Sequence, residues 1–231
     1  MPALFLAPRL IFLKESFCMR RIVRPVRRET INVLGVDPSL TSTGYAYRNS
    51  TGEVVTGTID PGKLSGPWRL FYVRMQMAKI IGLAAPTIVV YEDYAMGKAK
   101  GASNTIFHIG ELGGVLKTLF WENGIDVMLV APTALKKAIT GRGDADSAKR
   151  VGKKMQPFKP EMRAALLNTF KLDLSQNDEA DAAGLMLMGE MRFGFNTIAE
   201  SLQKRLKLDT LEECSIIQGR GNGLKSIAKK R

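Results

Sequence analysis

Residues 31–49 read INVLGVDPSLTSTGYAYRN, and this stretch decides the fold. An apolar run ends in a carboxylate, Asp37, and a polar turn leads into a second segment in which apolar and polar residues alternate. EVVTGTID, at residues 53–60, alternates again after a short hairpin. This spacing predicts three adjacent strands.

Further along the chain, apolar runs alternate with helical periodicities. Residues 67–83 and 103–120 are expected to form helices, and TIVVYE at 87–92 a buried strand that ends in Glu92. IDVMLVAP at 125–132 predicts one more buried strand. Shorter helices are expected beyond it, at 133–140, 145–155, 160–170 and 178–191. The order predicts an α/β fold with one mixed β-sheet, three antiparallel strands and then parallel ones, flanked by helices.

The composition indicates a globular protein with a polyanionic partner. The 231 residues include 34 Lys plus Arg against 22 Asp plus Glu, a net charge of +12, while 45% are hydrophobic. Nucleic acid is the commonest partner for such a charge, and an anionic membrane surface is the alternative. Two cysteines and one histidine exclude a disulfide scaffold, a structural zinc site and a His-based triad. No apolar run approaches the length of a membrane span.

Most of the positive charge lies at the two ends of the chain. Residues 1–30 carry +5, residues 31–199 carry +3 and residues 200–231 carry +4. Three interpretations of residues 1–30 stay open: a leader ahead of a start at Met19, a basic DNA-binding arm, or an organellar targeting peptide. We expect a folded domain over 31–195 and a helical extension with a basic tail over 196–231. The expected location is the cytoplasm, or an organellar matrix if residues 1–30 are a targeting peptide.

Four carboxylates in three segments suggest a catalytic metal centre. Asp37 and Glu92 each end a strand, and Asp178 and Asp181 lie one turn apart on one face of a helix. Four acids brought together need cations, and Mg²⁺ suits carboxylates plus a substrate phosphate. Two such ions about 4 Å apart would activate water and stabilise a leaving oxygen. The pattern predicts metal-dependent phosphodiester hydrolysis.

The segments that carry these acids resemble RuvC-type Holliday-junction resolvases of the RNase H-like superfamily. The similar stretches are GVDPSLTSTGYAY (35–47), VVYEDYAMGK (89–98), PTALKKAITGRGDADSAKRV (132–151) and NDEADAAG (177–184), and they occur in family order. Together they cover residues 31–192. The chain departs from the family pattern at Ser39, where the family has glycine, and in its two long ends, which suggests a viral or organellar member.

The resemblance implies an RNase H-like fold and a structure-selective endonuclease that resolves four-way DNA junctions during recombination and repair. It implies that Asp37, Glu92, Asp178 and Asp181 are catalytic metal ligands for two Mg²⁺, with Mn²⁺ as a substitute, and that Lys149 contacts the phosphate. Symmetrical nicks with 5′-phosphate and 3′-OH ends would come from a homodimer, for which helix 103–120 is the candidate interface. The residues implied to bind branched DNA are Tyr94, Lys98, Lys136, Lys137, Arg142, Lys149, Arg150 and Lys153.

Three other activities share part of this sequence pattern. A sugar-kinase or actin-like phosphotransferase also begins with a strand and a Gly-x-Asp, but it needs two such domains and a second phosphate loop, which this chain does not offer. A non-catalytic junction-binding protein would not need all four acids. A nuclease of the same fold that acts on forks, flaps or RNA–DNA hybrids stays open.

Overall fold

The computed structural model describes residues 31–93, 103–143, 160–193 and 215–217 of the chain. Strands and helices follow one another in the order that the sequence predicts. The elements are β1 (Val33–Asp37), β2 (Thr43–Arg48), β3 (Val54–Ile59), α1 (Gly66–Ala84), β4 (Ile88–Glu92), α2 (Ser103–Glu122), β5 (Asp126–Val130), α3 (Pro132–Thr140), α4 (Pro160–Phe170), α5 (Asn177–Arg192) and β6 (Ser215–Ile217).

The strands form one mixed sheet in the order β3-β2-β1-β4-β5-β6. β1, β2 and β3 are antiparallel to one another, whereas β1, β4 and β5 run parallel. Because parallel neighbours are joined through crossover helices, the sheet is covered on both faces. The predicted sheet, with three antiparallel strands followed by parallel ones, is confirmed.

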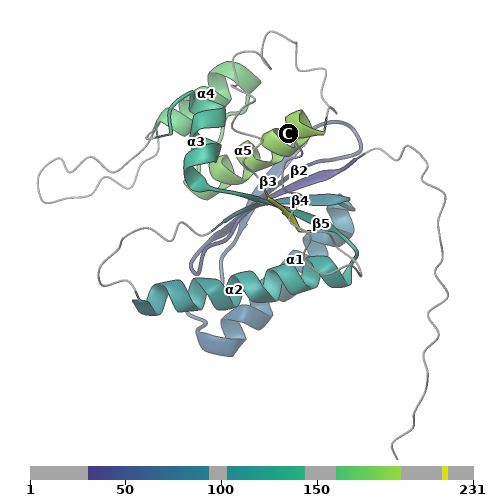
Figure 1. Cartoon of the computed structure of the whole chain (residues 1–231), viewed down its shortest axis with the longest axis vertical. Helices are drawn as coiled ribbons and strands as arrows, with labels where there is room; N and C mark the ends of the chain where they lie inside the picture. Colours follow the sequence, from purple (N-terminus) through teal and green to yellow (C-terminus); the bar gives the residue numbers. More distant parts are fainter. Residues whose placement is uncertain (1–30, 94–102, 144–159, 194–214, 218–231) are drawn as a thin grey trace, which may run out of the picture.

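Helices form one layer on each face of the sheet (Figure 1). α1 and α2 cover one face, where Leu34, Val36 and Tyr91 point into the core. α5 covers the other face and packs on Val33 and Val90, and α3 and α4 lie against α5. Side chains along β1 and β4 therefore alternate between two apolar cores, as the two-residue period of a strand requires.

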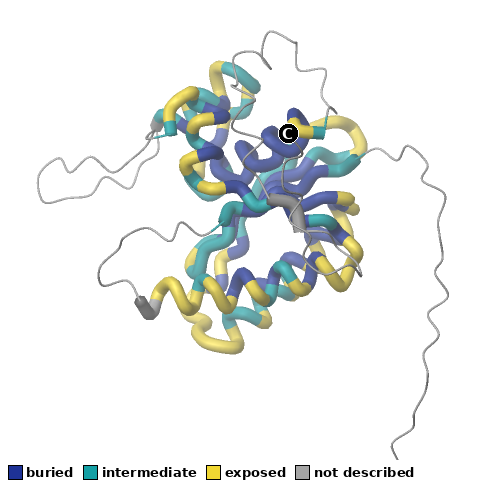
Figure 2. Tube along the Cα trace, in the orientation of Figure 1, coloured by how far each residue is buried: buried dark blue, intermediate teal, exposed yellow. Residues whose placement is uncertain are grey.

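α5 lies at the centre of its layer, between the sheet and the other two helices. Every residue from Ala180 to Met191 is buried, and Figure 2 shows this helix among the most enclosed parts of the molecule. Its small residues suit that position: a Cβ on Gly184 would already lie 3.0 Å from Leu135 and 3.2 Å from Ile139 of α3. A helix enclosed in this way holds its backbone, and any polar group at its start, in a fixed place.

Some expected elements differ or lie outside the described residues. The helices expected at 67–83, 103–120, 133–140, 160–170 and 178–191 are present with ends within two residues of those positions. The helix expected at 145–155 and residues 1–30 lie outside the described residues. β6 pairs with β5 inside the segment 196–231 that we expected to be helical. No helix in the described part of the chain combines the length and the apolar character needed to cross a membrane.

Candidate active site

Strand register brings Asp37 and Glu92 to the same edge and the same face of the sheet. β1 and β4 run in parallel with Gly35 opposite Val90 and Val36 opposite Tyr91, so the two acids occupy the next position of each strand. Val90 points into the core beneath α5 and Tyr91 into the opposite core. Because successive side chains alternate, Glu92 points to the α5 side, and Asp37 does the same from β1.

The third carboxylate comes from the start of α5. Asp37, Glu92 and Asp181 each offer a carboxylate oxygen, and these three oxygens lie within 4.8 Å of one another. Asp37 is 8% exposed and Asp181 is 3% exposed, whereas Glu92 is half-buried. Three oxygen ligands at this spacing, open to solvent at one side, suit a hard divalent cation such as Mg²⁺. We call these three residues the carboxylate triad.

Asp178 does not belong to this group of three. It lies on the first turn of α5, three residues before Asp181, and the two positions are separated by about 4.5 Å along the helix axis. Its backbone packs against Gly44 of β2, the residue that pairs with Asp37. Its predicted role as a fourth ligand stays a prediction.

The acidic residue between them points elsewhere. Glu179 accepts a hydrogen bond of 3.4 Å from the Thr56 hydroxyl of β3, away from the triad. Burial raises the pKa of the nearby Tyr45 phenol above its ordinary value, and Tyr47 and the Glu179 carboxylate add to this rise. Tyr45, which packs on the α1 and α2 side of the sheet, is thus neutral at neutral pH.

The loop that follows Asp37 is closed by a buried threonine, Thr43, which was not among the predicted site residues. The Thr43 hydroxyl donates to the Ser39 carbonyl at 2.9 Å and accepts from the Ser39 N–H at 3.2 Å. Thr43 is fully buried. Ser39, which departs from the family pattern, is thus fixed through its backbone, while its hydroxyl lies 3.2 Å from that of Thr41. A threonine at the start of a predicted strand, six residues after a candidate acid, is the sequence feature that indicates such a loop-closing hydrogen bond.

Three of the predicted DNA-binding residues lie in the described part of the chain, around α3. This helix starts directly after β5, whose last residue pairs with Glu92, so it begins at the sheet edge that holds the triad. Lys136 is half-buried and Lys137 is exposed. Arg142, after the helix, lies 3.8 Å from the Glu161 carboxylate of α4. The surface is therefore less positive than a count of basic residues suggests. Five predicted contacts lie outside the described residues: Tyr94, Lys98, Lys149, Arg150 and Lys153.

The fold and the triad together define the class of protein. A mixed sheet that starts with three antiparallel strands and continues with parallel ones, with acids at the ends of β1 and β4 and on α5, is typical of the RNase H-like fold. The comparisons with known proteins agree with this class. The family model described as "Crossover junction endodeoxyribonuclease RuvC" matches residues 33–158.

Individual relatives carry the same description. The RuvC of Caldicellulosiruptor saccharolyticus is 31% identical over 122 residues, which span 50% of this chain and 72% of the relative. The RuvC of Rhodopseudomonas palustris strain BisA53 is 28% identical over 130 residues, 54% of this chain and 73% of the relative. A solved structure of T. thermophilus RuvC with a Holliday junction substrate shares the fold, at a TM-score of 0.53 and 16% identity over 68% of this chain and 91% of that one. The chain belongs to the RuvC family of crossover junction endodeoxyribonucleases.

Proposed function

We propose that this chain resolves four-way DNA junctions by divalent-metal-dependent hydrolysis of phosphodiester bonds. The observation that carries the proposal is the carboxylate triad, in which three strand and helix ends place carboxylate oxygens within 4.8 Å of one another. The family match over residues 33–158 adds the substrate class.

Each triad residue has a distinct task in the proposed reaction. Asp37 and Asp181, both buried, would hold a cation at a fixed point of the sheet edge, and the half-buried Glu92 would complete the site on its solvent-facing side. Two bound Mg²⁺ ions, or Mn²⁺ in their place, would supply an activated water and neutralise charge on the leaving 3′-oxygen. Water attack then breaks the P–O3′ bond and leaves a 5′-phosphate and a 3′-OH. Asp178 is the proposed fourth ligand, and Lys149 the proposed phosphate contact.

The direct test replaces one acid at a time. Asp37→Asn and Glu92→Gln each remove a ligand charge with little change in shape, so cleavage of a four-way junction in Mg²⁺ should be lost while junction binding persists. Asp173→Asn, an exposed acid before α5, is the matched control and should cleave normally. Retained cleavage in the Asp37 or Glu92 variant would refute the assigned site.

Substrate selectivity needs a separate comparison. Nicks are mapped on each strand of four-way junctions, forks, flaps and RNA–DNA hybrids at one Mg²⁺ concentration. Paired, symmetrical nicks confined to the four-way junction support a resolvase. Equal or faster cleavage of forks, flaps or hybrids would assign the same chemistry to another branched substrate.

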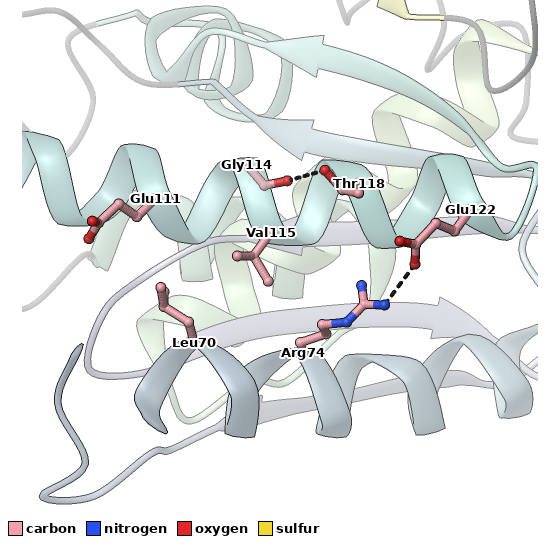
Figure 3. A pocket seen from close by; sticks show the side chains of 7 residues that line it. All are labelled: Leu70, Arg74, Glu111, Gly114, Val115, Thr118 and Glu122. Atoms are coloured by element: carbon pink, nitrogen blue, oxygen red, sulfur yellow. Dashed lines mark hydrogen bonds and ion pairs between the residues drawn. The ribbon is translucent and has the colours of Figure 1, made fainter. Parts of the chain in front are cut away.

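A homodimer is the proposed active form, with the layer of α1 and α2 as its interface. A groove of about 520 Å³ runs between these helices; Leu70 and Val115 line it, and the ion pair between Arg74 and Glu122, 2.7 Å long, spans it (Figure 3). Apolar side chains stay exposed around it, with Trp68 at 72% and Phe107 at 70%. The occupant we propose is a second copy of this chain, because paired nicks on opposed strands require two active sites and this apolar layer faces away from α5.

Light scattering at micromolar concentration, with and without junction DNA, tests the dimer. Phe107→Asp should yield monomers, whereas Leu167→Asp, an exposed apolar residue on α4 in the other layer, should not. A monomeric unmodified protein under both conditions would contradict the proposal.

The role of the N-terminal segment can be tested by deletion. Removal of residues 1–18 should leave cleavage unchanged if they are a leader. A large loss of junction affinity at moderate salt would instead identify a DNA-binding arm, because phosphate contacts by Lys and Arg are strongly salt-dependent.

A further inference from the structure

The start of α5 lies in direct contact with the backbone of β2. Gly44 is the residue of β2 that pairs with Asp37. A Cβ built on Gly44 would lie 2.6 Å from the Asp178 carbonyl carbon, closer still to its oxygen, and 3.3 Å from its Cα. These atoms belong to the helix backbone, so a rotamer change cannot relieve the overlap. A glycine inside a strand often marks such a close approach of another backbone.

This contact sets how closely the first turn of α5 approaches β2, while Gly35 of β1, where a Cβ would lie 2.6 Å from the Met186 nitrogen, allows the next turn to approach β1. Asp178 stands one turn before Asp181, and Gly44 stands opposite Asp37 in the antiparallel pair. The distance between β2 and the first turn therefore contributes to the distance between the Asp181 carboxylate and the Asp37 carboxylate. A methyl group on Gly44 would force that turn outward by about 1 Å, a displacement that matters at a metal site or catalytic centre.

The other end of α5 is held by different means. A Cβ on Gly189 would lie 2.6 Å from a methyl of Val33 and 2.6 Å from a methyl of Val90. The next residue, Glu190, is buried and forms a two-point ion pair with Arg48, with N–O distances of 2.9 and 3.0 Å. An overlap at Gly189 would therefore displace side chains about two helical turns away from Asp181. The ion pair with Arg48 of β2 holds that end of α5 in place against the sheet.

We propose that Gly44 is a positioning residue for the metal site, which acts by letting the first turn of α5 rest on β2 so that Asp181 reaches Asp37 and Glu92. The inference rests on the proposed metal-dependent function. It assigns a role in metal binding to a residue that carries no ligand atom of its own.

The test compares two glycine-to-alanine variants on the same helix–sheet contact. Gly44→Ala and Gly189→Ala both introduce overlaps under 3 Å, at the triad end and the far end of α5 respectively. Both are made in a Gly82→Ala background, because a Cβ at this exposed helical position of α1 meets nothing within 4 Å and should raise helix stability. Mn²⁺ binding to the DNA-free protein is measured by calorimetry, and the free energy of unfolding by urea titration.

The expected result separates metal affinity from stability. Gly44→Ala should raise the Mn²⁺ dissociation constant by about tenfold or more, the range found for residues that support metal ligands. The Mg²⁺ concentration for half-maximal cleavage should rise in parallel. Gly189→Ala should lose at least as much stability with its Mn²⁺ affinity unchanged.

Three outcomes would overturn the inference. The first is a Mn²⁺ affinity that changes in neither variant, and the second is an equal loss of affinity in both. The third is failure of Gly44→Ala to fold in the background where Gly189→Ala folds, since that would assign Gly44 to the fold as a whole. Absence of Mn²⁺ binding by the unmodified protein would instead refute the proposed metal-dependent function, and the role of Gly44 with it.

Discussion

Replacing Asp181 by asparagine should stabilise the metal-free protein while it removes metal binding. Asp181 is 3% exposed and lies with Asp37 and Glu92 in a group whose carboxylate oxygens are within 4.8 Å of one another. Three negative charges at that spacing repel one another, and a buried charge also loses hydration. Asparagine keeps the shape of the side chain and removes the charge, so both costs fall.

The size of the effect follows from the spacing. Two unit charges at 4.8 Å repel by about 3.5 kcal/mol at an effective dielectric constant of about 20, and Asp181 takes part in two such pairs. Solvent around the half-buried Glu92 reduces this sum. We expect a net gain of about 1–3 kcal/mol in the free energy of unfolding.

Urea titration in EDTA and in Mg²⁺ measures this prediction. In EDTA, Asp181→Asn should unfold at higher urea than the unmodified protein. In Mg²⁺ at about 100 times the dissociation constant, the unmodified protein should gain about 2.7 kcal/mol and the variant nothing, so the order of stability reverses or nearly so. Asp173→Asn is the control, because this acid is exposed and should shift neither curve. A variant that is less stable than the unmodified protein in EDTA would refute the reasoning.

Two further predictions concern polar contacts that hold the frame of the site. Arg48→Met leaves the Glu190 carboxylate buried without its two-point partner. The expected loss in the free energy of unfolding is about 2–3 kcal/mol, below the range for a fully buried pair because Arg48 is about a third exposed. The double variant with Glu190→Met should recover part of this loss, and strictly additive losses in urea titration would contradict a coupled pair. Thr43→Val removes both hydrogen bonds to Ser39 and should cost about 1–3 kcal/mol, whereas Thr43→Ser should retain most of the stability. Equal losses in the two Thr43 variants would assign the effect to the methyl group.

The sequence predicted the sheet and the position of Asp37 and Glu92 at one edge of it for the same reason. Buried strands show as apolar runs, and an acid that closes such a run marks the sheet edge. Asp37 and Glu92 follow from this rule because both strands have five residues and run in parallel. Helical spacing predicted Asp178 and Asp181 together, and Asp181 is the one whose carboxylate oxygen lies within 4.8 Å of those of Asp37 and Glu92 in the structure.

Contacts between distant residues could not be predicted in this way. The pair between Arg48 and Glu190 joins residues 142 positions apart, and neither residue stands in a motif. β6, at Ser215–Ile217, pairs with β5 at the sheet edge from a region that we expected to be helical. Gly44, by contrast, left a signal: a glycine within an alternating strand, next to a candidate acid, indicates that another backbone approaches there.

The buried body of α5 explains how three like charges can be kept together. Every residue from Ala182 to Met191 is buried, so the rest of the helix contributes apolar burial at about 25 cal/mol per Å². That contribution does not depend on the charge of Asp181, and it offsets the repulsion among the acids in the absence of a cation. The same packing opposes a movement of Asp181 away from the sheet. Repulsion stored in this way is released when a cation binds, so the apolar packing of α5 contributes directly to metal affinity.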